Sequence, residues 1–203
     1  QKMIGAAAVL LAALALAGGS GQLAALDDFP AAAAITALGA QSEADNAAAL
    51  AAQTAGETPD FTKKVFASAT AGENALRIAG VTVSLHEIQV EKTAGASAET
   101  AADGDGAALL VTGGAQATIR GAKISASVPG SQGAVGSGTD TVLQLTDSSI
   151  TTTGDRADGL QTADGATVTA ASVTVTTAGD DSAVVRAGSG TLVLQGGVYT
   201  SGG

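Results

Sequence analysis

Residues 141–162, TVLQLTDSSITTTGDRADGLQT, contain the most informative pattern of the chain. Three short strand-like segments lie at 141–145, 149–153 and 159–162, and apolar and polar residues alternate in such segments of the chain, as in Val173-Thr174-Val175-Thr176. Alternation with a period of two predicts β-strands that bury one face. Asp, Ser and Gly separate the segments, and these residues favour turns. The stretch therefore predicts three strands within one short unit.

Aliphatic residues at matching places recur about every 25 residues from residue 73 onward. The first column has gaps of 25, 25 and 25: Leu110, Val135, Leu160 and Val185. The second column has gaps of 26, 25 and 24: Ile119, Leu145, Ala170 and Leu194. The third column has gaps of 26, 23 and 25: Ile124, Ile150, Val173 and Val198. Glycines keep the same period: Gly130, Gly154, Gly179 and Gly203.

This period excludes most repeat architectures. Repeats of 20–50 residues are typical of solenoids, propellers and arrays, but a propeller blade needs about 40 residues and four strands. No unit contains a ten-residue helical pattern, which excludes ankyrin and tetratricopeptide repeats. We therefore predict an all-β parallel β-helix with three strands per coil of about 25 residues, and with successive coils about 4.8 Å apart. The aliphatic columns are expected to point inward.

The chain divides into three regions. Residues 1–21 contain Lys2 and an uncharged, Ala- and Leu-rich stretch at 3–17 that ends in Ala15-Leu16-Ala17. This pattern predicts either a signal peptide or a retained apolar anchor helix. Residues 22–72 are interpreted as a transition or cap region, with helices near 31–34 and 47–52, or alternatively with strands at 31–36 and 63–67. Residues 73–203 form the predicted β-helix.

Composition excludes several classes of protein. Among 203 residues only 2% are aromatic and the net charge is −10, which argues against base stacking and against binding a nucleic acid or another polyanion. The chain has no Cys, so disulfide frameworks, thiolate metal sites and Cys nucleophiles are excluded. A hydrophobic fraction of 45% with 14% charged residues exceeds what a disordered chain carries.

The region 73–203 resembles bacterial right-handed β-helix surface proteins. The resemblance rests on Glu73-Asn74-Ala75-Leu76-Arg77, Val90-Glu91-Lys92-Thr93-Ala94-Gly95, Ile150-Thr151-Thr152-Thr153-Gly154-Asp155 and Gly197-Val198-Tyr199-Thr200. It implies a right-handed, pectin-lyase-like fold on a secreted or surface-displayed protein. It also implies an adhesin-like or carbohydrate-binding role without an assigned reaction.

Four acidic residues form the candidate metal site. Asp155 and Asp180 lie one repeat apart, and Asp158 and Asp181 lie beside them. Stacked coils would bring the first two carboxylates within about 5 Å, a spacing that suits Ca²⁺ and its oxygen ligands. The alternative is that these aspartates only form turns and keep the solenoid soluble. The sequence predicts no other cofactor.

Apart from these aspartates, the sequence contains no pattern typical of a catalytic site. His86 is the only histidine, and we interpret it as a residue on a strand face rather than a catalytic base. There is no phosphate-binding loop and no GxSxG nucleophile turn. Outward hydroxyl groups can bind ordered water or a sugar chain, or reflect only the β-propensity of threonine. The candidate array is Ser125, Ser127, Thr151, Thr153, Thr174 and Thr176.

We therefore predict a non-enzymatic, secreted or cell-surface protein with a structural or adhesive role. Residues 181–203 contain Asp181 and Arg186 as their only charged residues, and such a nearly neutral end favours head-to-tail association of copies into a filament. The alternative is a polysaccharide-binding module, with Ca²⁺ at the stacked aspartates. A polysaccharide lyase-like enzyme is the third interpretation.

Overall fold

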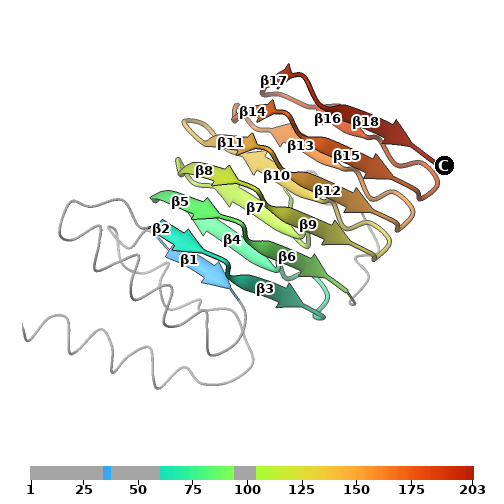
Figure 1. Ribbon diagram of the computed structural model, residues 1–203, viewed down its shortest axis with the longest axis horizontal. Helices are drawn as coiled ribbons and strands as arrows, with labels where there is room; N and C mark the ends of the chain where they lie inside the picture. The colour runs from blue at the N-terminus through green and yellow to red at the C-terminus, as the bar shows by residue number, and fades with distance from the viewer. Residues whose placement is uncertain (1–33, 38–59, 94–103) are drawn as a thin grey trace, which may run out of the picture.

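The computed structural model describes residues 34–37, 60–93 and 104–203. Within these ranges the chain forms eighteen strands in three six-stranded sheets, here called A, B and C (Figure 1). Each sheet takes every third strand, so the backbone passes through sheets A, B and C in turn before it enters the next coil. The prediction of an all-β parallel solenoid is confirmed.

Sheet A consists of β1 (Ala34–Ala37), β4 (Leu76–Ala79), β7 (Leu109–Thr112), β10 (Ala134–Ser137), β13 (Leu160–Ala163) and β16 (Val185–Ala187). Sheet B consists of β2 (Asp60–Thr62), β5 (Thr82–His86), β8 (Gln116–Arg120), β11 (Val142–Thr146), β14 (Thr167–Ala171) and β17 (Thr191–Gln195). Sheet C consists of β3 (Val65–Ser68), β6 (Gln89–Lys92), β9 (Lys123–Ala126), β12 (Ser149–Thr152), β15 (Thr174–Thr177) and β18 (Val198–Ser201).

Neighbouring strands run parallel in all three sheets, with one exception at the start of the solenoid. β1 pairs antiparallel with β4, so that Ile35 is level with Ile78. β2 and β3 pair in parallel with β5 and β6. The parallel coils therefore begin at Asp60, ahead of residue 73, where the sequence analysis placed the start of the β-helix.

Part of the N-terminal prediction concerns residues 1–33 and 38–59, which lie outside the described ranges. The apolar stretch at 3–17 and the helix expected at 47–52 are both there. The stretch 31–36, for which helix and strand were both open, overlaps β1. In the part of the chain that the structure describes, no helix is both long and apolar enough to cross a membrane.

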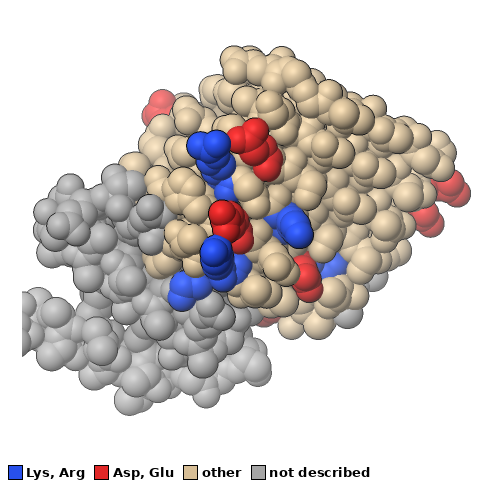
Figure 2. Space-filling model, in the orientation of Figure 1, with Lys and Arg blue, Asp and Glu red and all other residues tan. Residues whose placement is uncertain are grey.

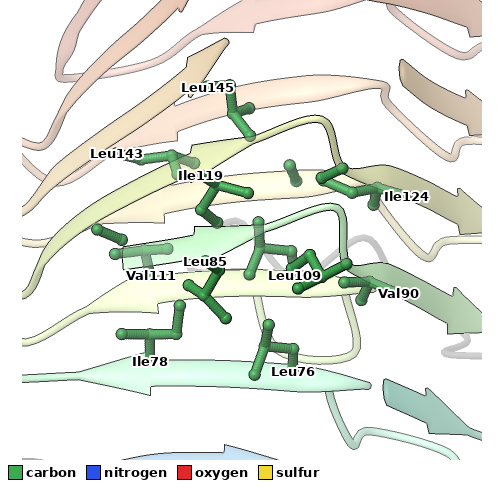
Figure 3. Packing of buried hydrophobic residues seen from close by; sticks show 14 of the residues in the cluster. Leu76, Ile78, Leu85, Val90, Leu109, Val111, Ile119, Ile124, Leu143 and Leu145 are labelled. Atoms are coloured by element: carbon green, nitrogen blue, oxygen red, sulfur yellow. The ribbon is translucent and has the colours of Figure 1, made fainter. Parts of the chain in front are cut away.

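The core is a stack of aliphatic side chains that point from the three sheets toward the axis of the solenoid (Figure 3). In β11, Leu143 and Leu145 are fully buried and Gln144 between them is exposed. Full burial of a leucine side chain is worth about 1.5–3 kcal/mol. The second predicted column is confirmed, with Leu85 added below it: Leu85, Ile119, Leu145, Ala170 and Leu194 are level.

The first predicted column is wrong at its middle step. Val135 is level with Leu110 below it and with Gln161 above it, whereas Leu160 is level with Ala134. The turn between β10 and β11 spans residues 138–141, one residue longer than the turn at 164–166 between β13 and β14. The extra residue shifts the register between these coils by one position. Because successive side chains of a strand point to opposite faces, Leu110 and Val135 lie on the outer face of sheet A and not in the inner column.

The third predicted column is wrong at Val173 and Val198. Ile150 is level with Val175, which in turn is level with Tyr199. Val173 is buried but precedes β15, and Val198 points outward with 58% of its surface exposed. Val173 and Val175 are two residues apart and lie on the same face of the chain, so alternation alone does not show which one is level with Ile150.

Three of the four predicted glycines stack in the turns between sheets C and A. A Cβ atom on Gly179 would lie 2.0 Å from the carbonyl oxygen of Gly154, and one on Gly203 would lie 2.5 Å from that of Gly179. Gly130 is not in this stack, because Gly154 packs against the backbone of Val128 instead. The stacked glycines let the coils approach more closely than any side chain would permit.

One residue with positive φ turns the backbone from sheet B to sheet C in each coil, and in the last described coil a second one, Gly197, follows it. In the first five described coils this residue donates its N–H to the next coil, as Asp147 does to the carbonyl oxygen of Ala171 at 3.0 Å. The six residues are Lys63, Glu87, Gly121, Asp147, Ser172 and Gly196, with φ between 50° and 70°. The left-handed conformation costs a non-glycine residue about 1–2 kcal/mol, which the regular stacking of the coils offsets.

A second, small apolar cluster lies on the outer face of sheet A at β7 and β10. It contains Leu110, Val135 and Ala107, all at most 2% exposed. A Cβ atom on Gly104 would lie 2.8 Å from side-chain atoms of both Leu110 and Val135, so the backbone of this glycine packs directly on them. The side-chain amide of Asn74 holds the segment by donating to the carbonyl oxygens of Gly104 at 2.9 Å and Ala107 at 3.0 Å. Leu110 and Val135 are therefore buried although they point away from the axis.

Candidate functional site

Asp155 and Asp180 occupy the same place in neighbouring coils, in the turns between sheets C and A. The backbone N–H of Asp180 donates to Oδ1 of Asp155 at 3.1 Å. The backbone N–H of Arg156 in turn donates to the carbonyl oxygen of Asp180 at 2.8 Å. Both aspartates are exposed. The stacking expected from the 25-residue interval is present, and the carboxylate of Asp155 takes part in the turn.

Asp158 has a different environment, because its side chain is only 1% exposed. Oδ1 accepts hydrogen bonds from the backbone N–H of Ala183 at 2.7 Å and from a terminal guanidinium nitrogen of Arg186 at 3.1 Å, and Oδ2 accepts one from Nε of Arg186. These hydrogen bonds and the charge of Asp158 raise the pKa of Arg186. The pair joins the turn before β13 to β16 of the next coil.

The four predicted calcium ligands are thus divided between two environments. The carboxylate of Asp158 is directed to Arg186, whereas Asp155, Asp180 and Asp181 are exposed. Across the described residues no three Asp, Glu, His or Cys side chains gather closely enough to hold a metal ion. The calcium site stays a prediction.

Removing the guanidinium should destabilise the last coil. We expect the substitution Arg186→Met to lower the free energy of unfolding by about 2 kcal/mol, because it leaves a buried carboxylate without its counter-charge and the solvent around the half-exposed Arg186 moderates the loss. Urea denaturation of the two proteins measures this difference. Lys123→Met, which removes an exposed charge from β9, should change the free energy by less than about 0.5 kcal/mol.

The double variant Asp158→Asn with Arg186→Met separates the effect of the lost counter-charge from the effect of the lost packing of the Arg186 side chain. We expect it to recover part of the stability lost in Arg186→Met, because the neutral amide needs no counter-charge. An equal loss in the single and the double variant would mean that Arg186 acts through its aliphatic stem alone.

Lys92 is a buried charged residue whose position the sequence did not reveal. It lies at an inward position of β6, level with Ser68 and Ala126, and is only 1% exposed. Its ammonium group donates to Oγ of Ser68 at 3.3 Å and to the carbonyl oxygen of Thr70. Burial lowers the pKa of Lys92, and the charge of Glu73 opposes this shift. These hydrogen bonds tie the first C-to-A turn to the second coil.

His86 lies on the outer face of sheet B, level with Thr62 and Arg120. It is partly exposed, and no second histidine exists in the chain. This position agrees with the interpretation of His86 as a residue on a strand face.

Charged side chains concentrate on one part of the surface formed by sheets B and C. Figure 2 shows them over the earlier coils and along the edges, whereas the surface of the later coils is uncharged. Ion pairs follow the bend between the two sheets: Lys63 with Glu87 at 3.6 Å, and Arg120 with Asp147 at 3.3 Å. These side chains are exposed, so each pair is worth less than about 1 kcal/mol.

From Val142 onward the outward strand residues of sheets B and C carry no charge, and Asp147 lies in the bend between β11 and β12. We name them the threonine face, since more than half are threonine. The threonine face consists of Val142, Gln144, Thr146, Thr167, Thr169, Ala171, Thr191, Val193 and Gln195 of sheet B and Ser149, Thr151, Thr174, Thr176, Val198 and Thr200 of sheet C.

Only part of the predicted hydroxyl array forms one ladder, that is, one row of level residues in neighbouring coils. Ser125, Thr151 and Thr176 are level with one another on the outer face of sheet C, and Thr200 continues the ladder. Thr174 belongs to the parallel ladder of Ser149. Ser127 and Thr153 follow the ends of β9 and β12, so they lie in turns. The outward threonines of sheet B were not predicted as an array, because Gln and Val occupy other positions of the same ladders.

The fold and this surface together define a class: an all-β parallel β-solenoid with about 25 residues per coil, one charged region and one uncharged hydroxyl-rich face. Comparisons with family models, with curated proteins and with solved structures found no match to the chain.

Proposed function

We propose that the chain is an extracellular, non-enzymatic structural or adhesive protein whose copies associate end to end. The observation that carries the proposal is the surface of the coil formed by β16, β17 and β18. In the described chain each of these strands pairs with a neighbour on one side only. Unpaired strand edges favour the addition of further strands.

The same coil exposes part of the apolar core. Leu194 continues the inner column of Leu145 and Ala170, yet 43% of its surface is exposed. Leu192 and Tyr199 are partly buried against the core below them. Any further coil would cover this apolar surface and continue the three sheets, and in an end-to-end assembly a second copy provides that coil. Such a head-to-tail contact does not close on itself, so repeated contacts would form a filament.

Leu194→Lys tests this proposal. We expect the wild-type protein to show a mass that increases with concentration in sedimentation velocity, and rods by electron microscopy. Leu194→Lys should weaken this association at least tenfold, because the contact would bury an unpaired ammonium group. Thr118→Lys is the matched control, since it adds the same charge to the outer face of the same sheet three coils away, on β8. A wild-type protein that stays monomeric at millimolar concentration would refute the proposal.

A polysaccharide-binding module is the second candidate, and one observation favours it. No outward threonine hydroxyl of the threonine face hydrogen-bonds to another described residue. The inward hydroxyls of Thr152 and Thr162, by contrast, donate to the carbonyl oxygens of Ala157 at 2.6 Å and Ala166 at 3.0 Å. The outward hydroxyls are therefore available to a ligand that is itself rich in hydroxyl groups.

A further inference from the structure

We propose that the threonine face binds a long, uncharged polysaccharide chain; this inference rests on the second candidate function. The face extends over two adjoining sheets and three coils, so its area suits an extended polymer rather than a small molecule. The charge of the face, its hydrogen-bonding groups and its regular spacing all favour such a ligand.

The distribution of charge selects a neutral ligand. The chain has a net charge of −10, but the threonine face has none. The exposed carboxylates of Asp155, Asp180 and Asp181 follow the strands of sheet C at one border, and Asp164 precedes β14 at the other. Polyanions such as uronic-acid polymers would meet these carboxylates and no cation on the face itself. A neutral chain meets no such repulsion.

The hydrogen-bonding groups match a polyol. Each threonine hydroxyl donates one hydrogen bond and accepts up to two, and the side-chain amides of Gln144 and Gln195 both donate and accept. Sugar hydroxyls have the same dual character. The β-propensity of threonine explains its place in the strands. It does not explain why Lys, Glu and Arg, which occupy outward positions of β6, β8 and β9, are missing from the outward positions of sheets B and C in the later coils.

The spacing of the face repeats in two directions. Level residues of neighbouring coils are about 4.8 Å apart, and outward residues of one strand are about 6.7 Å apart. No aromatic side chain projects from the face, so each sugar unit is held by hydrogen bonds and methyl contacts alone. Such contacts are individually weak, and only a long chain that engages many of them at once binds firmly.

Co-sedimentation of the protein with two insoluble, uncharged glucans, one β-1,4-linked and one β-1,3-linked, tests the inference. We expect the wild-type protein to pellet with at least one of them. Soluble polygalacturonate and a six-unit oligosaccharide of the bound glucan should not compete. EDTA should have no effect, because the face contains no carboxylate. Loss of binding in EDTA would place the ligand at Asp155 and Asp180 and would overturn the inference.

Two double variants locate the binding surface. Thr169→Lys with Thr176→Lys alters the middle of the threonine face, and we expect it to weaken glucan binding at least tenfold. Thr118→Lys with Ser125→Lys places the same charges on the same two ladders in an earlier coil, outside the face, and should bind within twofold of wild type. Equal binding by both variants, or no binding of either glucan by the wild type, would refute the inference.

The experiment is separate from the test of end-to-end association. Leu194→Lys alters the inner column of the last described coil, and we expect it to leave glucan binding within twofold of wild type. Leu194→Lys protein that pellets equally with and without glucan would show that the glucan contributes nothing to sedimentation, and would overturn the inference.

Discussion

The substitution Leu145→Asp should abolish cooperative folding of the solenoid. Leu145 is fully buried in the middle of the inner column of sheet B, between Ile119 and Ala170. Among the described residues, those level with Leu145 in neighbouring coils are all apolar, so no cationic side chain of this column can pair with an aspartate there. Burying an unpaired carboxylate and losing the leucine should together cost more than about 4 kcal/mol, a large part of the 5–15 kcal/mol that stabilises a typical domain. Far-UV circular dichroism and thermal unfolding measure the loss.

Gln144→Asp is the matched control, because Gln144 is the preceding residue of β11 and points to solvent. We expect this variant to unfold within about 0.5 kcal/mol of the wild type. A similar loss of stability in both variants would mean that Leu145 and Gln144 do not differ in burial, and would contradict the structure.

Deleting residues 142–166 should leave a folded solenoid that is one coil shorter. The deletion removes β11, β12 and β13 and joins Thr141 to Thr167, which is level with Val142. β14, β15 and β16 would then stack on β8, β9 and β10 in the register that the removed strands had. Because each coil contacts only its neighbours, the loss of one coil lowers stability without changing the rest of the fold.

A deletion that does not match the period should have a much larger effect. Removing residues 142–153 takes out about half a coil, so the following strands would meet the wrong sheets and expose their apolar faces. We expect this variant to show no cooperative unfolding transition, whereas the deletion of 142–166 keeps one. Loss of folding in both variants, or in neither, would contradict a stacked 25-residue coil.

The period was predictable from the sequence because it depends on repeated local chemistry. Three strand-like segments per unit and turn residues between them suffice to predict a parallel solenoid, and the column of Ile119, Leu145, Ala170 and Leu194 was placed correctly. Register within a coil was harder, because turns differ by one residue from coil to coil. The extra residue in the turn at 138–141 separated Val135 from Leu160, and nothing in the local pattern marks it.

The candidate site was predictable only where it follows the period. Asp155 and Asp180 were placed together because they lie 25 residues apart. The pair of Asp158 and Arg186 was missed, since its members are 28 residues apart and long side chains span the difference. The burial of Lys92 was missed because a lysine in a strand normally points outward. The threonine face was not predicted, because it combines outward residues of two sheets that lie side by side only in the folded chain (Figures 1 and 2).

Distances between spin labels along one outward ladder test the stacking of the coils most directly. The chain has no Cys, so pairs of introduced cysteines label cleanly at Ser84 together with Gln144, Thr169 or Val193, which lie two, three and four coils from Ser84 in the same ladder. The structure predicts separations that increase by about 4.8 Å per coil, from about 10 Å to about 19 Å between backbones. Separations that do not increase by a constant step with coil number would contradict it.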